Sequence, residues 1–384
     1  MRPGAGEPSD TSPAPAEPVT ATAAIADAEA QVLRRIATVR KRKPVLRDDA
    51  VTMSHGAGGK ASHTLVAALF ADVLSNPVLD ELGDQALLPI PGTDSLLAVT
   101  TDSFVVSPLF FPGGDIGELA VNGTINDLAV GGAVPLGLAA AFILEEGLDM
   151  ATLRRVVESM RAAADSAGVS VVTGDTKVVP RGKADRLFVT TTGVGIVEAR
   201  HRLGMHRIES GDAVLLSGAM GDHGATVMLA RGDLDLEAPG LRSDTAPLHR
   251  LTAALLDAGI DVHFMRDATR GGVATVLNEI AQGSGLAIAI EEARLPVHDE
   301  VRGVAEILGI DPLYIANEGK LVAILPAAQV AEALLIMRAR PEAAEAVAIG
   351  EVLPEPEGMV FVHTGFGGTR VVDMLIGDPL PRIC

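Results

Sequence analysis

The residue with the clearest capacity for chemistry is the last one. Cys384 is the single cysteine among 384 residues, and it follows Pro381, Arg382 and Ile383. A thiolate can carry a covalent group, but the adjacent terminal carboxylate is expected to raise the thiol pKa, since one negative charge disfavours another. Reactivity would therefore need a cationic environment, from Arg382 or from a lysine of a docking site. The alternative is an incidental frayed terminus.

Four aspartates stand at predicted strand or helix boundaries of the first half of the chain. They are Asp84, Asp102, Asp127 and Asp175. Magnesium prefers oxygen ligands and is usually held by a few carboxylates together with substrate phosphates. Aspartates converging from several strand ends would suit magnesium and ATP. Each could equally be a turn or cap residue, and both interpretations stay open.

A glycine-rich segment at residues 55–60 could cradle phosphates with its backbone N–H groups and a lysine. The candidate residues are His55, Gly58, Gly59 and Lys60. The segment is not a Walker A loop, which would need other residues at both of its ends. Taken alone, the pattern favours a flexible turn.

A second such segment, residues 267–272, precedes a predicted helix, where free N–H groups and the helix dipole attract anions. It contains Asp267, Arg270 and Gly271, and it favours a phosphate contact.

Two further segments hold residues suited to a reacting group. In residues 173–179, Thr176 could contact phosphate and Lys177 could bind phosphate or orient a substrate, although an exposed lysine is an equal alternative. Glu318 lies beside Asn317 in a glycine-containing turn and could act as a general base. The sequence alone favours a cap of the next strand for Glu318.

Alternating apolar strands and amphipathic helices predict two α/β domains in tandem, with α+β packing possible in each. We expect an apolar strand at 136–144 and a helix near 244–258. Two further helices are expected, one capped by Asp115 and running to about Val130, and one capped by Asp149 and closed by Gly168. We expect a disordered Pro- and Ala-rich extension at 1–45, domains at 46–200 and 201–363, and a flexible tail at 364–384. The prolines of that tail favour extended chain. Its last seven residues could therefore reach about 23 Å.

The composition narrows the functional class. Hydrophobic residues make up 48%, enough for a large core, and the net charge of −19 argues against broad contact with nucleic acid. No apolar run reaches the roughly 18 residues needed to span a bilayer, and no secretory signal is apparent. With no disulfide possible within the chain, we expect a cytoplasmic location.

Together these motifs resemble the HypE family of hydrogenase maturation factors, over about residues 48–384. The matching segments are 101–117, 123–130, 173–179, 266–272, 311–314, 316–320 and the terminal Pro-Arg-Ile-Cys. The family belongs to the ATP-binding group of aminoimidazole ribonucleotide synthetase and selenophosphate synthetase. The resemblance implies the two-domain α/β fold of that group and a homodimer formed through the first domain.

The resemblance also implies a reaction. The carbamoyltransferase HypF loads a carbamoyl group onto the sulfur of Cys384, and ATP-dependent dehydration turns it into a thiocyanate. The cyanide then passes to iron on the HypC–HypD complex, for the nickel–iron hydrogenase centre. Magnesium and ATP would be held by Asp84, Asp102 and Asp267, with Asp127 and Asp175 close behind.

By the same resemblance, Lys177 would polarise the amide, Glu318 would act as base, and the 55–60 loop would close over the phosphates. Two positions depart from the family pattern. Gln85 stands where many relatives have a second aspartate, which weakens the metal assignment around Asp84, and Ala268 replaces a common proline. Two rivals stay open: another ATP-dependent synthetase or kinase of this fold, and a non-catalytic thiol carrier.

Overall fold

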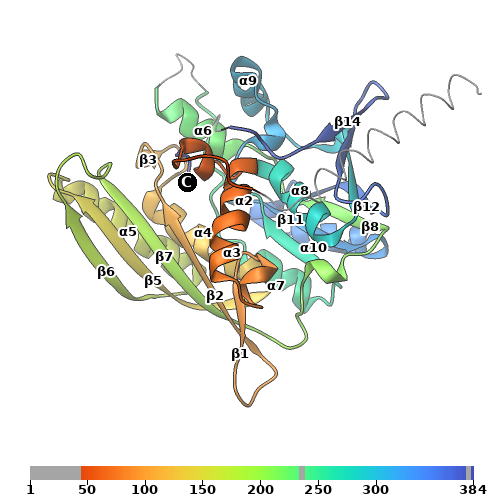
Figure 1. Cartoon of the computed structure of the whole chain (residues 1–384), viewed down its shortest axis with the longest axis horizontal. Coiled ribbons are helices and arrows are strands. Elements are labelled where there is room, and N and C mark those ends of the chain that lie inside the picture. Colours follow the sequence, from red (N-terminus) through yellow and green to blue (C-terminus); the bar gives the residue numbers. More distant parts are fainter. Residues whose placement is uncertain (1–44, 233–237, 378–381) are drawn as a thin grey trace, which may run out of the picture. The chain divides into compact units, whose positions relative to one another are not determined.

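The computed structural model describes residues 45–232, 238–377 and 382–384. The predicted extension at 1–45 therefore lies almost wholly outside the described residues. Within the described ranges, every helix is too short or too polar to traverse a lipid bilayer. Two mixed sheets with their helices form the two parts of the fold (Figure 1).

The first sheet has five strands in the order β1-β2-β7-β5-β6. They are β1 Ala86–Pro89, β2 Leu96–Phe104, β5 Ala133–Glu145, β6 Val171–Val179 and β7 Leu187–Val197. Only β5 and β6 pair in parallel, and the other pairs are antiparallel. Along β7, fully and partly buried residues alternate, as expected for a strand with one face packed on helices.

Two helices, α4 (Ile116–Val130) and α5 (Met150–Ala167), supply the core of this first part. The Asp115 carboxylate caps α4 by accepting the N–H groups of Gly117 and Glu118 at 2.8 and 3.2 Å. Asp149 caps α5 in the same way, and Gly168 ends it with a φ of 74°, which a residue with a side chain rarely adopts. Both caps and both helices agree with the sequence prediction.

The second sheet has seven strands in the order β14-β13-β10-β12-β8-β11-β9. They are β8 Asp212–Leu216, β9 Phe264–Asp267, β10 Ala287–Glu291, β11 Leu321–Pro326, β12 Val347–Leu353, β13 Val360–His363 and β14 Thr369–Val372. The accompanying helices are α6 Asp222–Ala230, α7 His249–Asp257, α8 Gly272–Ser284, α9 Asp299–Leu308 and α10 Val330–Arg338.

The central strand β8 is buried along its whole length because both of its faces are covered. Val214 and Leu216 belong to a core with α8, whereas Ala213 and Leu215 belong to a second core with α7 and α10. Strand side chains alternate between faces, so a continuous apolar run fits a sheet packed on both sides.

The remaining elements of the described residues are short. They are helices α2 Lys60–Leu65 and α3 Ala71–Leu74, separated by a π-helical segment at Val66–Phe70, and the two-residue strands β3 Phe110–Phe111 and β4 Gly114–Asp115. Seven further 3-10 segments are Met53–Gly56, Leu79–Glu81, Met205–Arg207, Glu292–Arg294, Pro312–Tyr314, Ala327–Gln329 and Pro341–Ala343.

Two features differ from the sequence prediction. The helix expected over 244–258 begins only at His249, because Pro247 disfavours helical backbone at the residue before it. The segment 364–384, expected as a flexible tail, contains β14, which pairs with β13, and its end is packed into the protein. Pairing with β13 fixes β14, and burial of Ile383 fixes the end of the chain.

Candidate active site

The last three residues dock between the two parts of the fold and contact both. The carbonyl oxygens of Cys384 and Arg382 accept hydrogen bonds from the backbone N–H groups of Val105 and Ser107, each at 3.1 Å. Val105 and Ser107 directly follow the end of β2. Their partners run in the opposite chain direction, so the terminus pairs with this segment in an antiparallel manner. Ile383 is 3% exposed and belongs to a buried apolar cluster that joins residues of both parts.

This docking brings the thiol of Cys384 to the carboxyl group of Glu318, to which it donates a hydrogen bond. Burial, and secondarily the nearby Glu318 and Asp102, raise the pKa of the thiol, although Arg270 acts in the opposite direction. The sulfur is therefore held as a neutral thiol. The thiol is presented to a polar site rather than frayed into solvent.

The turn that carries Glu318 is fixed by its neighbours. Asn317 donates to the Ala268 carbonyl and accepts from the Gly221 N–H, both at 2.7 Å. The Glu318 N–H donates to Asp244 at 3.0 Å. The Glu318 side chain is buried, and within the described residues its Oε1 atom has no hydrogen-bond partner. The carboxyl group adjoins the Cys384 thiol, so its position does not match the cap of the next strand that the sequence alone favoured.

Burial raises the pKa of Glu318 well above its usual range, and repulsion from Asp267, Asp102 and Asp244 adds to the effect. A carboxylate that binds a proton tightly is suited to removing one from a substrate.

Four of the predicted aspartates are drawn together beside this turn. Burial raises the pKa values of Asp127 and Asp267 well above the usual range, and the charges of Asp84 and Asp102 contribute to both shifts. The pKa values of Asp84 and Asp102 are raised too, by burial first, against the opposing charges of Arg266 and Arg270 respectively. The aspartates thus form one acidic cluster, from β2, α4, β9 and the loop before β1.

Arg266 holds this cluster in place. Its guanidinium pairs with Asp84 at 2.8 Å and with Glu279 at 3.3 Å. The Thr100 hydroxyl lies 2.7 Å from Asp127 Oδ2 and 2.8 Å from the Asp84 carbonyl oxygen, so it links the two aspartates.

The two glycine-rich loops pack against each other beside the acidic cluster. The Arg270 guanidinium donates to the Gly56 carbonyl at 3.1 Å, and the Thr275 hydroxyl donates to the Gly58 carbonyl at 3.2 Å. A Cβ atom on Gly58 or Gly271 would meet the opposing backbone at 2.6 Å, so only glycine allows this approach. A Cβ atom on Gly59 would lie only 2.4 Å from the Leu375 carbonyl oxygen.

The other members of the first loop are placed differently. His55 is buried, and its Nδ1 accepts from the Thr52 N–H at 3.0 Å, so it stabilises its own turn. Lys60 is exposed at the start of α2, and its N–H donates to the Leu375 carbonyl at 2.9 Å.

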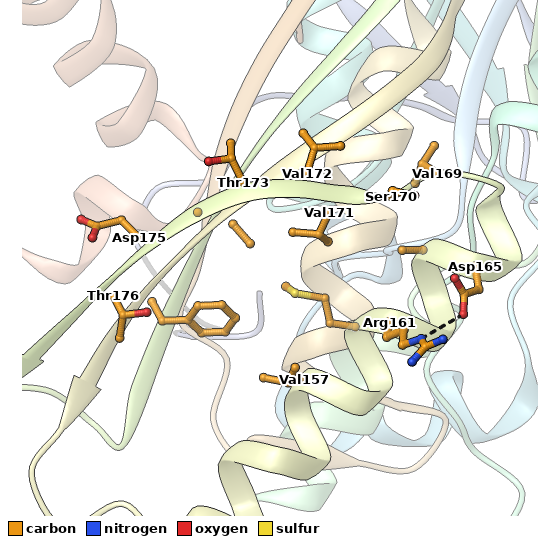
Figure 2. Close-up of a pocket in the computed structure, with 15 residues that line it drawn as sticks. Val157, Arg161, Asp165, Val169, Ser170, Val171, Val172, Thr173, Asp175 and Thr176 are labelled. Carbon is orange, nitrogen blue, oxygen red and sulfur yellow. Dashed lines mark ion pairs between the residues drawn. The ribbon is translucent and has the colours of Figure 1, made fainter.

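Asp175, Thr176 and Lys177 lie on β6, an edge strand of the first sheet that contributes no residue to the acidic cluster. Figure 1 shows this strand at the outer side of the sheet. Lys177 pairs with Asp175 at 2.5 Å, and both side chains are more than 60% exposed. Asp175 and Thr176 line a pocket of about 850 Å³ between β6 and α5. Figure 2 shows the side chains of that pocket, with Arg161 paired to Asp165 on α5.

Oxygen donors dominate the acidic cluster, which is the chemistry that magnesium requires. Among the described residues, no three histidine, cysteine or carboxylate side chains are arranged as a complete ligand set. Magnesium bound with a nucleotide needs only one or two protein carboxylates, since phosphates and water fill its other positions. The cluster fits such an ion.

The comparisons with known proteins agree on one family. Profiles of the "AIR synthase related protein" N-terminal and C-terminal domains match residues 82–197 and 209–363. The carbamoyl dehydratase HypE of Rhodobacter capsulatus is 52% identical over 341 residues, which cover 88% of this chain and 99% of the relative. The chain belongs to the HypE family.

Two solved HypE structures are similar throughout. A crystal structure of HypE in complex with ATP has 47% identity and a TM-score of 0.73, covering 87% of this chain and 100% of that one. A crystal structure of a HypE–HypF complex has 45% identity and a TM-score of 0.76, covering 81% of this chain and 99% of that one. The family resemblance and the two-domain α/β fold predicted from the sequence are thereby confirmed.

Within this HypE-family chain, the shared AIR synthase fold and the terminus contribute different parts of the site. The acidic cluster and Glu318 fall inside the two matched ranges, whereas Cys384 lies beyond residue 363. The sequence prediction assigned no role to Thr100, Arg266, Asp244, His223 or Arg231. Arg266 adjoins the predicted Asp267, and that spacing was the one available signal.

Proposed function

We propose that this chain is an ATP-dependent carbamoyl dehydratase of hydrogenase maturation, acting on a carbamoyl group carried by its own Cys384. The observation that supports it most directly is the docked thiol, hydrogen-bonded to Glu318 beside the acidic cluster. A carrier that only ferries a group needs no buried carboxyl at its sulfur, and a synthetase acting on a free substrate needs no docked terminus.

The reaction converts an S-carbamoyl group and ATP into a thiocyanate, ADP and phosphate. The amide oxygen forms a bond to the γ-phosphorus while the bond from that phosphorus to ADP breaks, which makes the oxygen a leaving group. The carbon–oxygen bond then breaks, phosphate departs, and both N–H protons have been lost to give the nitrile. Glu318 receives a proton from the amide nitrogen, since it adjoins the thiol and its buried Oε1 has no hydrogen-bond partner among the described residues.

The positively charged and N–H groups of the glycine-rich loops hold the phosphates. Arg270 lies near both Cys384 and Asp102, which puts it between the tail and the cluster. Bound magnesium would screen the phosphate charges, with Asp84, Asp102 and Asp267 as its candidate ligands and Asp127 nearby.

Lys177 lies on the edge strand β6, which contributes no residue to the acidic cluster, so its route to a bound nucleotide needs a separate explanation. Val172 and Val178 on β6 are each 68% exposed, and Val134 and Leu136 on β5 are more than half exposed. An exposed apolar strand face commonly marks an interface. A homodimer formed through this sheet would cover these residues, and it would give Asp175, Thr176 and Lys177 a route to a nucleotide.

The partners follow from the chemistry of the reaction. HypF would load the carbamoyl group, and the HypC–HypD complex would accept the cyanide. The proposed location of all these steps is the cytoplasm, where ATP and a reduced thiol are both present.

The test uses full-length chain whose Cys384 has been carbamoylated by HypF, freed of nucleotide, and then incubated with Mg–ATP. Intact mass should report the loss of one water from the Cys384-loaded protein. Glu318→Gln should bind ATP as before but dehydrate about 10²–10⁴-fold more slowly. Loaded wild-type protein that keeps its full mass while hydrolysing ATP would contradict the proposed function.

A further inference from the structure

Helix α6 and the residue after it contact the docked tail at its backbone. His223 Nε2 lies 2.6 Å from the Ile383 carbonyl oxygen, and Arg231 Nη2 donates to the Arg382 carbonyl at 2.7 Å. Neither contact involves the Cys384 side chain, so neither requires a free sulfur.

The surroundings of His223 fix which nitrogen carries its proton. The ring is fully buried, with Phe111 edge-on at a centroid distance of 5.4 Å, and its Nδ1 lies 2.8 Å from the Ser243 hydroxyl. Burial lowers the pKa of His223, only partly opposed by the charge of Asp244, so the ring is neutral. A neutral ring has one N–H, and the Ile383 carbonyl can only accept. Nε2 therefore donates to the tail, and Nδ1 accepts from Ser243.

Arg231 joins the tail to the segment that receives it. Its Nε donates to the Ser107 carbonyl at 2.8 Å, while the Ser107 N–H donates to the same Arg382 carbonyl that Arg231 contacts. A guanidinium presents several donors in a fixed plane, so one side chain can hold both segments in register.

The docked backbone needs such support. Arg382 has a φ of 56°, a left-handed conformation that residues other than glycine rarely adopt. A strained residue persists when its surroundings determine its conformation, and here its carbonyl receives two hydrogen bonds. The Arg382 side chain adds a bond to the Val105 carbonyl at 3.2 Å and a partly exposed pair with Asp185 at 2.6 Å.

We propose that His223 and Arg231 are positioning residues that hold the docked tail by the backbone carbonyls of Ile383 and Arg382, and so set the docked fraction of Cys384. This assignment deepens the proposed function and rests on it, because the thiol must be accessible to the loading enzyme and then return to Glu318.

The chain's single cysteine makes the docked fraction measurable. N-ethylmaleimide modifies an exposed thiol, and intact mass counts the modification. All variants share the same free tail, so a ratio of labelling rates reports docking alone. In the presence of Mg–ATP, Arg231→Ala should label at least about tenfold faster than wild type, since it loses hydrogen bonds from a charged donor. Arg231→Lys should fall between, because a lysine cannot span both carbonyls.

The second pair of variants separates hydrogen bonding from packing at residue 223. His223→Phe keeps an aromatic ring against Phe111 but leaves the Ile383 carbonyl without its donor, and it should label several-fold faster. His223→Gln restores an N–H near the position of Nε2 and should return the rate toward that of wild type. Asp185→Asn is the matched control, since a partly exposed pair contributes little, and its rate should stay within about twofold.

Loading and dehydration distinguish this proposal from the proposed function. Loading by HypF should not fall in Arg231→Ala, whereas single-turnover dehydration should fall as docking weakens. Wild-type labelling rates in Arg231→Ala and His223→Phe, with both variants folded and binding ATP, would overturn the positioning role even if wild type forms thiocyanate. If wild type forms none while the labelling rates differ as stated, the reaction is wrong and the positioning role stands.

Discussion

Ile383 is the apolar contribution to docking, and Ile383→Ala tests its magnitude. The side chain is 3% exposed and packs in the apolar cluster shared by the two parts of the fold, beside the sulfur-bearing residue. The substitution removes three carbon groups, each of which contributes about 0.8 kcal/mol when buried, or about 2.4 kcal/mol in total. At about 1.4 kcal/mol per tenfold change, the docking equilibrium should fall by roughly 50-fold.

The assay measures N-ethylmaleimide labelling of Cys384 and single-turnover formation of thiocyanate in the same preparation. Labelling should accelerate and dehydration should slow, while the melting temperature changes little, because releasing three terminal residues does not open either sheet. Ile376→Ala is the matched control: that isoleucine is 82% exposed in the same terminal segment and should change neither rate.

Ile383→Leu keeps the apolar volume and should behave nearly as wild type. Wild-type rates of labelling and dehydration in Ile383→Ala would refute the apolar contribution of Ile383. It is also refuted if Ile376→Ala causes an equal loss, since burial would then not be the cause.

Three further changes test other parts of the structure. Lys177→Ala should slow dehydration and leave urea unfolding unchanged, because the side chain is exposed and paired only along its own strand. Arg266→Met should cost about 3–5 kcal/mol in the free energy of unfolding, since it leaves the largely buried Asp84 without its partner. Wild type should lose stability as the pH falls below about 6.5, the ordinary pKa of histidine, because burial lowers the pKa of His223 in the folded state. The unfolded chain then binds a proton at His223 more readily than the folded chain does.

The Arg266 variant and the pH test each have a matched control variant. Arg200→Met breaks exposed pairs with Glu198 and Asp257 and should cost under about 1 kcal/mol, so an equal effect would remove the case for Arg266. For the pH test, urea midpoints at about pH 7.5 and 5.5 are compared with those of His223→Phe. The groups facing the ring are the Ser243 hydroxyl, the Ile383 carbonyl, Phe111 and the charge of Asp244. A variant that loses as much stability as wild type would assign the acid sensitivity to other groups.

Local patterns predicted the elements of the fold well where they carried their own signals. Asp149 and Gly168 bound α5 as their capping preferences required, and the long apolar run of β5 was evident from composition. Strands β9 and β11 were not predicted separately, because short buried strands lack a period of their own. Strand β14 escaped detection for a related reason, since its partner β13 determines its conformation.

The site was predictable in its chemistry and less so in its geometry. Asp84, Asp102, Asp127 and Asp267 were singled out by residue type and boundary position, and they do converge. Nothing in the sequence around Glu318 indicates that its side chain is buried beside a terminus 66 positions later, because that contact depends on the two parts of the fold meeting. His223 and Arg231 escaped detection because they act through backbone carbonyls, which leave no trace in residue types.

The charges around Cys384 favour a carbamoylated sulfur over an ionised thiolate. A thiolate would add negative charge beside Glu318 and Asp102, and the raised pKa of Cys384 expresses that penalty, with burial as its largest cause. An S-carbamoyl group is neutral, so it can occupy the same place without the repulsion. It also brings two N–H donors to a carboxyl whose Oε1 lacks a partner among the described residues. The free thiol is also neutral but lacks these donors, so loading should strengthen docking through hydrogen bonding. The carbamoylated protein should protect its terminus from carboxypeptidase better than the free thiol form does.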